Sequence, residues 1–203
     1  IADGDWSSDV CSSDLWIIRA GLFVWLVVLM SGCEEENTKM VYELNQSDDL
    51  SPEVYEVFSG MITSYYGDQD YIVVQQETDT SLHRNICYEL LTSGTTSLTE
   101  NTLRNYIQSN RESKNLANNF LTHNQVKLIT REEFNSYETW ERFHENYPEG
   151  KGLLVLRLPG FNKDKTQALF EFSWRSGDES EVNHLLYMEH ANGDWHIRAH
   201  TSH

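Results

Sequence analysis

Cysteine is scarce in this chain, and its distribution excludes disulfides from the folded part. Only three cysteines occur among 203 residues. Cys11 and Cys33 lie in or at the edge of an amino-terminal leader, which leaves Cys87 alone in the domain. A lone cysteine cannot close an intradomain disulfide, so a hydrophobic core must hold the fold by itself. We expect Cys87, beside Ile86 and Tyr88, to be a small buried residue rather than a nucleophile.

Basic residues are few compared with acidic ones. The chain has 15 Lys and Arg against 32 Asp and Glu, a formal charge of −17. Setting aside the charged leader residues (Asp3, Asp5, Asp9, Asp14 and Arg19) leaves 28 acidic and 14 basic residues, or −14 for residues 34–203. So acidic a surface repels phosphate backbones and anionic lipids. We therefore expect no nucleic-acid partner and no membrane docking through a basic patch.

The main apolar run is too short to span a bilayer. Residues 20–30 form an eleven-residue run after Arg19, whereas a spanning helix needs about 20 residues. A positive charge before a run of this length is typical of a signal peptide. The small residues Ser31 and Gly32 then let an extended backbone enter a peptidase, and Cys33 offers a nucleophile for a diacylglyceryl group.

Residues 29–33, Leu-Met-Ser-Gly-Cys, resemble the lipobox of bacterial lipoproteins, with Met30 where Leu is usual. The resemblance implies cleavage between Gly32 and Cys33, a thioether-linked lipid on Cys33 and usually a further acyl chain. Two chains make a stable membrane anchor. An uncleaved anchor helix, or a secretory signal with an incidental cysteine, remains open as an alternative.

The segment before the leader has no structural periodicity. Residues 5–15 resemble, residue for residue, a translated sequencing adapter, so we treat residues 1–15 as not native and exclude them from the fold. The rest divides into a lipoprotein signal peptide (16–32), an acidic flexible tether (33–48) and a single α+β domain (49–203). The tether begins with three glutamates, and so polar a run cannot bury apolar area.

The lipobox also predicts where the protein resides. We expect a monomer in the bacterial cell envelope, held at the membrane by the lipid on Cys33. Acidic residues directly after the cysteine resemble sorting signals whose rules differ between bacterial groups. The periplasmic face and the outer surface therefore both stay open.

Hydrophobic spacing predicts helices in the first half of the domain and strands in the second. Helices are expected after Ser51, after Thr99 and from Thr130 to Pro148, with buried strands at 71–74 and 126–129. From Gly152 onward the period is two, with turns at 159–162, 176–179 and 192–193. We therefore predict an α+β fold: an antiparallel four-stranded carboxyl-terminal meander packed with helices from the amino-terminal half.

Four short motifs carry a wider resemblance. They are Trp-x-x-Phe-x-x-x-Tyr-Pro at 140–148, Gly-Phe-Asn at 160–162, Thr-Gln-Ala-Leu at 166–169 and Asn-Gly-x-Trp at 192–195. Together they resemble a family of exported bacterial proteins of unknown activity, over roughly residues 50–200. The chain departs from the family at 176–183, where other members often have a Gly-rich segment, sometimes with cysteines. The resemblance implies export and this fold, and it brings no activity.

The histidines near the carboxyl terminus raise the question of a metal site. On a strand, His196 and His200 lie about 13 Å apart, at about 3.3 Å per residue, too far to share an ion. A two-residue turn at 192–193 pairs Glu189 with His196, which puts His190 and His196 on opposite faces, and likewise His184 and His200. The sequence has no His-x-x-x-His on a predicted helix and no Cys-x-x-Cys. We expect no metal and no cofactor.

The same register predicts the two faces of the last hairpin. It pairs Tyr187 with Arg198 and Leu185 with His200. The core face is then expected to contain Leu186, Met188, Ile197 and Ala199. The opposite face becomes a candidate polar site made of Tyr187, Glu189, His196 and Arg198. A Glu–His pair there could perform acid–base catalysis or be a solvated ion pair.

The sequence has no nucleophile elbow, P-loop or dinucleotide fingerprint. We therefore expect a lipid-anchored envelope domain that binds a small ligand or a protein partner without catalysis. The alternative is an envelope hydrolase with a polar pocket over the last hairpin. A structural or immunity-like envelope component is a third possibility.

Overall fold

Helices and a mixed sheet make up the part of the chain described by the computed structural model, which comprises residues 41–83, 97–178 and 180–202. Contacts divide the chain after Lys39, and all these residues belong to the second unit, Met40–His203. In chain order the elements are α1 (Pro52–Tyr66), β1 (Tyr71–Gln75), α3 (Glu100–Ser109), β2 (Gln125–Ile129), α4 (Arg131–Ser136), α5 (Trp140–Asn146), β3 (Leu153–Leu156), β4 (Gly160–Phe161), β5 (Gln167–Gly177), β6 (Ser180–Ala191) and β7 (Asp194–Ser202). The predicted α+β class is confirmed.

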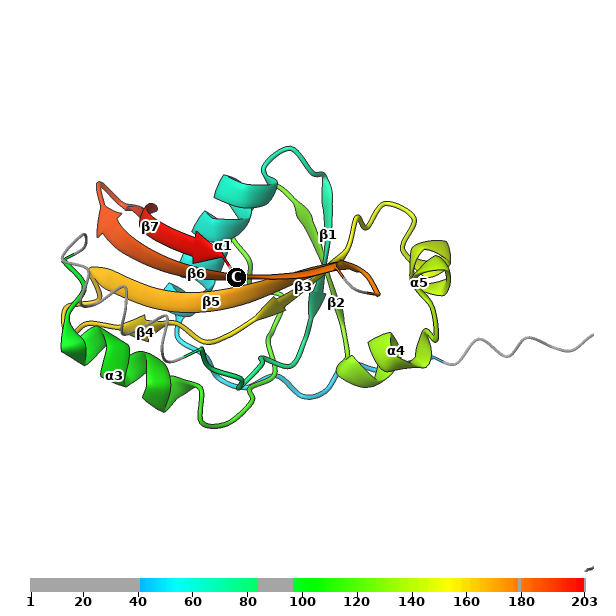
Figure 1. Cartoon of the computed structure of the whole chain (residues 1–203), viewed down its shortest axis with the longest axis horizontal. Helices are drawn as coiled ribbons and strands as arrows, with labels where there is room; N and C mark the ends of the chain where they lie inside the picture. The colour runs from blue at the N-terminus through cyan, green and yellow to red at the C-terminus, as the bar shows by residue number, and fades with distance from the viewer. Residues whose placement is uncertain (1–40, 84–96, 179, 203) are drawn as a thin grey trace, which may run out of the picture. The chain divides into compact units, whose positions relative to one another are not determined.

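The seven-stranded sheet has the order β2-β1-β3-β5-β6-β7, with β4 paired to β5 (Figure 1). The predicted four-stranded meander does not match this sheet in full. β3, β5, β6 and β7 are antiparallel neighbours, but β1 adds to β3 in parallel and β2 adds to β1 in parallel. Parallel neighbours need long crossover connections, so their pairing leaves no local mark in the sequence.

The helix α1 packs on one face of the sheet. Ser51 occupies the N-cap position and Pro52 the first turn, as predicted, although the Ser51 side chain makes no capping hydrogen bond. The buried stripe of α1 faces alternate residues of six strands. This first core contains Val57, Phe58, Met61 and Ile62 of α1 with Ile72, Leu154, Phe170, Phe172, Leu186 and Met188 of the sheet.

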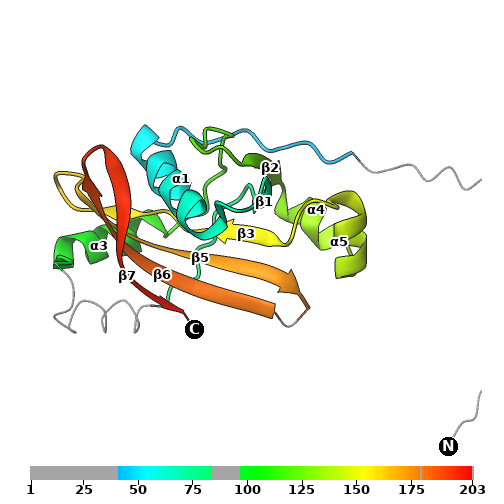
Figure 2. The same cartoon turned by 90° about the horizontal axis from the view of Figure 1, so that it is seen from above.

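Among the described residues, two separate groups of helices cover the second face of the sheet. Near one end, Leu103 and Tyr106 of α3 pack on Leu169, Leu185 and Tyr187. Near the other end, α4 and α5 cover a third cluster that includes Phe143, Tyr147, Val73, Leu153 and Val155. Figures 1 and 2 show α3 and the α4–α5 pair at opposite ends of the sheet in both views. Both faces of the central strands are therefore buried.

The helix predicted from Thr130 to Pro148 is interrupted. Thr130 caps α4 by accepting from Glu133 N, and Thr139 caps α5 by accepting from Arg142 N, with Tyr137 extended between them. Only half of the predicted capping box forms. The Glu133 carboxylate instead accepts from the Tyr137 hydroxyl over 2.9 Å and from the Tyr147 hydroxyl. Glu133 thus ties α4 to the end of α5.

The last hairpin turns at Asn192 and Gly193, as predicted. Their φ angles are 57° and 91°, the left-handed values that a two-residue type I′ turn requires. Asn and Gly tolerate this region better than other residues, so the local sequence determines the turn.

Hydrogen bonds to the sheet begin within the segment that the sequence assigns to the tether. Asn45 N donates to Gln76 Oε1 over 2.8 Å, and Gln76 Nε2 donates back to Asn45 O over 2.7 Å. Asp48 exchanges a similar pair of bonds with Asn115. We call residues 45–48 the amino-terminal strap. Because Gln76 is buried, the strap supplies hydrogen bonds to a side chain that water cannot reach.

Gly160 allows α3 to approach β4 closely. A Cβ built on Gly160 would lie 2.0 Å from Tyr106 N and 2.3 Å from Tyr106 Cα. We predict that Gly160→Ala lowers the free energy of unfolding by about 3 kcal/mol or more, the upper end of overpacking effects, because the obstacle is backbone. Urea denaturation followed by circular dichroism measures this. Gly177→Ala is the control, since its Cβ would meet nothing closer than 3.5 Å. Equal stability of the two variants would contradict the prediction.

Candidate ligand-binding groove

The candidate lipid-attachment site lies outside the described residues. This holds for Cys33 and for the cleavage position between Gly32 and Cys33. Within the described ranges, none of the helices has the length and apolar content needed to cross a bilayer.

The candidate polar face on the last hairpin is altered by a β-bulge. Glu189 pairs with His196 and His190 with Trp195, as predicted. The register then shifts between Met188 and Tyr187. The predicted pairs Tyr187–Arg198 and Leu185–His200 are wrong, because the strand β7 has one extra residue at this point.

The bulge changes which side chains share a face. Tyr187 faces Ala199, and Leu186 faces His200. Ala199 therefore packs with Leu185 and Tyr187 under α3, not in the core with Leu186 as predicted. His200 has the same facing as His184, contrary to the prediction, because both register positions lie on the Leu186 side of the hairpin.

Three of the four candidate residues still meet. The Glu189 carboxylate accepts from the Tyr187 hydroxyl over 2.6 Å, from Arg198 Nε over 3.1 Å and from the Ser97 hydroxyl. Hydrogen bonds from Ser97 and Tyr187 hold the pKa of Glu189 below its usual range. Burial raises the pKa of Tyr187 to about 12. The group is a bonded carboxylate beside a neutral phenol, a poor arrangement for accepting or supplying protons near neutral pH.

The fourth residue, His196, does not join this group. Its ring is exposed, and Nε2 lies 3.1 Å from Ala191 O within the hairpin. Glu189 and His196 are neighbours in register, but the carboxylate is directed to Tyr187 and Arg198 instead. Tyr187 is only 1% exposed, because α3 covers a face that the sequence predicts to be polar.

A buried ionic network lies further along the second face. Arg157 follows β3, while Glu171 and Ser173 face it from β5, and none of the three is more than 1% exposed. Arg157 Nη1 lies 3.4 Å from Glu171 Oε1. Arg157 Nη2 donates over 2.7 Å to Asp79 Oδ2. Desolvated charges are tolerated only when their partners and hydrogen bonds are complete.

The remaining polar atoms of the network are also engaged. Glu171 Oε2 accepts from the Tyr106 hydroxyl over 2.8 Å, and its Oε1 is bonded to His83 Nδ1. Burial alone would raise the pKa of Asp79, but hydrogen bonds from Ser81 and the charge of Arg157 outweigh it and leave that pKa below its usual range. The network joins α3, β3, β5 and the segment after β1, and it functions as an internal tie rather than an open site.

Sequence reasoning missed this network because of an assumption about the second face. Glu171 lies between Phe170 and Phe172, which predicts that it points to water if only one face is buried. The signal that was available is Leu169, Leu185 and Tyr187, which are apolar and share that facing. Apolar residues at one end of the second face indicate that helices cover this face. A charged residue on the same face, such as Glu171, then needs a buried partner.

An open cavity beside the sheet forms the best candidate site. Its volume is about 480 Å³, within the range of small-molecule sites. We call it the aromatic groove and define it by its lining residues: Phe134, Asn135, Tyr137, Glu138, Thr139, Trp140, Phe143, Arg175, Gly177, Asp178 and Glu181. It lies between α4–α5 and the turn that joins β5 to β6. Its aromatic motif was noted in the sequence, but its other wall comes from residues more than 30 positions away.

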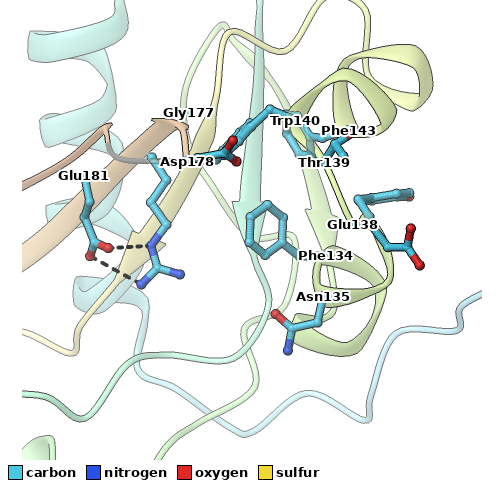
Figure 3. A pocket seen from close by; sticks show the side chains of 11 residues that line it. Phe134, Asn135, Glu138, Thr139, Trp140, Phe143, Gly177, Asp178 and Glu181 are labelled. Carbon is cyan, nitrogen blue, oxygen red and sulfur yellow. Dashed lines mark hydrogen bonds and ion pairs between the residues drawn. The ribbon is translucent and has the colours of Figure 1, made fainter.

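The rings of the groove pack edge to face. Trp140 lies 5.0 Å from Phe143 and 5.6 Å from Phe134 between ring centroids, both T-shaped. Figure 3 shows the Phe134 ring between Glu181 on one side and Glu138 on the other. Phe143 is fully buried and Trp140 is half-buried, so the floor is fixed while the rim reaches solvent.

Arg175 and Glu181 form a two-point ion pair across the β5–β6 hairpin. Arg175 Nε lies 3.0 Å from Glu181 Oε2, and Arg175 Nη2 donates over 3.3 Å to Glu181 Oε1. Both side chains are partly exposed, so the pair contributes little to stability. It orients the wall of the aromatic groove and leaves Glu138 and Asp178 as further carboxylates in the lining.

A second cavity of about 490 Å³ lies against the amino-terminal strap and is lined by Val41, Tyr42, Glu43, Asn45, Glu77, Thr130 and Glu132. The Glu77 carboxylate within it is already occupied. Its Oε1 accepts from Asn45 Nδ2 over 2.8 Å and its Oε2 from Arg131 N over 2.7 Å. This cavity therefore serves the attachment of the strap.

Searches for metal sites and relatives add no assignment. In the described ranges, no group of three or more His, Cys, Asp or Glu side chains is arranged to hold a metal ion. His184 stacks on Phe172 at 4.7 Å, and His190 lies 5.2 Å from Trp195, so both pack against rings. The chain matches no family model, no curated protein and no solved structure. The fold and groove define a class only: an α+β domain with an aromatic-lined cavity.

We predict that Arg157→Met lowers the free energy of unfolding by about 3–5 kcal/mol, because Glu171 loses its buried counter-charge. The double variant Arg157→Met/Glu171→Gln should lose less than the sum of the two single changes, since the two residues share one network. Urea denaturation at pH 7 measures all three.

Arg104→Met is the matched control for this prediction. Arg104 pairs with Glu100 over 3.0 Å, but both side chains are more than 70% exposed. The control should change stability by no more than about 0.5 kcal/mol. Equal effects of Arg157→Met and Arg104→Met would contradict a structural role of the buried pair.

Proposed function

We propose that this chain is a lipid-anchored protein of the bacterial envelope whose domain binds a small ligand or a protein partner at the aromatic groove, without catalysis. The observation that carries the proposal is the groove itself: an open cavity of about 480 Å³ with four aromatic side chains in its lining. Small-molecule sites commonly have this volume and combine aromatic surface with polar groups that orient the ligand.

The alternative, a hydrolase using the last hairpin, has weaker support. Glu189 and His196 do not form an acid–base pair, since the carboxylate accepts from Ser97, Tyr187 and Arg198. Neither residue lines either of the two cavities described above. Within the aromatic groove, Glu181 is held by Arg175. Binding without chemistry therefore agrees better with these contacts than hydrolysis does.

The envelope part of the proposal depends on the leader and on the resemblance of the later motifs to exported bacterial proteins. An apolar run of eleven residues ends at Met30, and small residues precede Cys33. A lipid on Cys33 would keep an acidic domain at the membrane without any basic patch. The leader fits the periplasmic face and the outer surface equally. We further propose that the domain is a monomer and that its carboxyl-terminal half is an antiparallel four-stranded meander.

We predict that the protein, expressed in a bacterium and extracted from its membranes, begins at a lipid-modified Cys33. Mass spectrometry of the amino-terminal peptide measures this directly. Cys33→Ser should abolish cleavage and modification, whereas Cys87→Ser should leave both intact. An unmodified Cys33, or an uncut peptide through Gly32, would overturn the lipoprotein proposal.

We predict that the aromatic groove binds small aromatic probes. Titrating the ¹⁵N-labelled domain with 2-phenylethanol should shift amide resonances of the groove and quench tryptophan fluorescence, because the probe's ring displaces water from the aromatic rings of the groove. Phe134→Ala should weaken binding several-fold. Leu121→Ala is the control, since Leu121 is 71% exposed and does not line the groove. Shifts scattered over the surface, with no effect of Phe134→Ala, would count against the groove.

A further inference from the structure

We propose that the aromatic groove selects organic cations: an ammonium or guanidinium group on an apolar stem. This inference rests on the proposed function and adds the chemical class of the ligand. The features that carry it are four aromatic rings, an excess of carboxylates around them, and the absence of a free cation in the groove's own lining.

The charges around the groove are unequal. Its lining contains three carboxylates, Glu138, Asp178 and Glu181, against one guanidinium, Arg175. The charge of Arg175 is offset by Glu181, which accepts one hydrogen bond from Nη2 and lies 3.0 Å from Nε. Glu138 and Asp178 then leave the lining with a formal charge of −2. In Figure 3, the Glu181 and Glu138 carboxylates lie on opposite sides of the Phe134 ring. The net charge of the lining therefore favours a cation over an anion.

The aromatic rings add an attraction of the same sign. The faces of Trp, Tyr and Phe carry negative charge density, and Trp is the strongest partner for a cation. An apolar stem can pack on the half-buried Phe134 and Trp140 rings while the charged end faces the rim, as long basic side chains do on other surfaces.

An anionic ligand has little to bind in the same place. The groove lining contains the Thr139 N-cap of α5, and the Arg142 backbone N–H there already donates to the Thr139 hydroxyl over 3.4 Å, so that amide is not free for an anion. The rest of the domain reinforces the preference, because a formal charge of −14 over residues 34–203 draws cations and repels anions. A neutral aromatic ligand would gain only the apolar contacts.

Three probes of nearly equal shape test this inference: 2-phenylethylamine, 2-phenylethanol and phenylacetate, which at pH 7 are cationic, neutral and anionic. Binding to the groove is followed by amide shifts and tryptophan fluorescence. We expect the amine to bind at least about three times more tightly than the alcohol, and the anion most weakly. Raising the salt concentration from about 0.05 to 0.5 M should lower the affinity for the amine and leave the affinity for the alcohol unchanged, because salt screens exposed charges.

Variants isolate the carboxylates. The double variant Asp178→Asn/Glu138→Gln should lower the affinity for the amine roughly three- to tenfold, since each exposed charge contributes modestly. The affinity for the alcohol should stay unchanged. The matched control is Asp164→Asn/Glu112→Gln, which removes the same charge from exposed positions outside the groove lining. Equal losses in both double variants would show attraction by net charge alone and overturn a site-specific preference.

The outcomes separate this inference from the proposed function. If amine and alcohol bind the groove equally, the cation preference is wrong and the groove stays a binding site. If none of the probes binds the groove, the proposed function fails as well. A blocked Gly-Lys-Gly peptide, compared with 2-phenylethylamine, tells whether the preferred ammonium belongs to a side chain or to a free small molecule. Tighter binding of either one supports the shared chemistry.

Discussion

The pairing of Arg157 with Glu171 inside the protein is the constraint on which the second face of the sheet depends. A fully buried charge is tolerated only if every donor and acceptor around it is satisfied. Here that requirement places Asp79 and Ser81 beside Arg157, and Tyr106 and His83 beside Glu171. The segment after β1, the helix α3 and the pairing of β3 with β5 are therefore specified together, because each supplies a partner to a buried polar atom of this pair.

The sequence predicts the helix starts and the turn correctly, because these features depend on residues that are adjacent in the chain. Pro52 begins α1, Thr99 and Thr130 cap α3 and α4, and Asn192–Gly193 turns the last hairpin. The parallel pairing of β1 and β2 was missed because their partners are distant in sequence. The bulge beside Tyr187 was missed because the pattern Ile197-Arg198-Ala199 alternates normally. One extra residue reverses the facing of everything after it.

The best candidate site is the aromatic groove and not the predicted polar face of the last hairpin, again because contacts between distant segments decide which residues are exposed. A polar face on the last hairpin requires that face to meet water, but Leu169, Leu185 and Tyr187 lie beneath α3 instead. The aromatic groove needs three segments at once: the two helices α4 and α5 and the hairpin between β5 and β6. The sequence marks Trp140 and Phe143 as a helical stripe, and one stripe predicts a core. Only the opposite wall, with Arg175 and Glu181, makes it a site.

The buried network and the groove share the strand β5. Along its second face, Leu169 packs under α3, Glu171 and Ser173 join Arg157, and Arg175 reaches the groove. Along β5, these second-face side chains change from an apolar residue to buried polar and charged residues and then to an ion pair at the surface. Because the network fixes β5 against β3, it also fixes the position from which Arg175 holds Glu181. The groove wall is thus built on the most constrained strand, while its charged rim stays solvated. The Arg175–Glu181 pair in this wall is therefore positioned by contacts that a ligand in the groove does not touch.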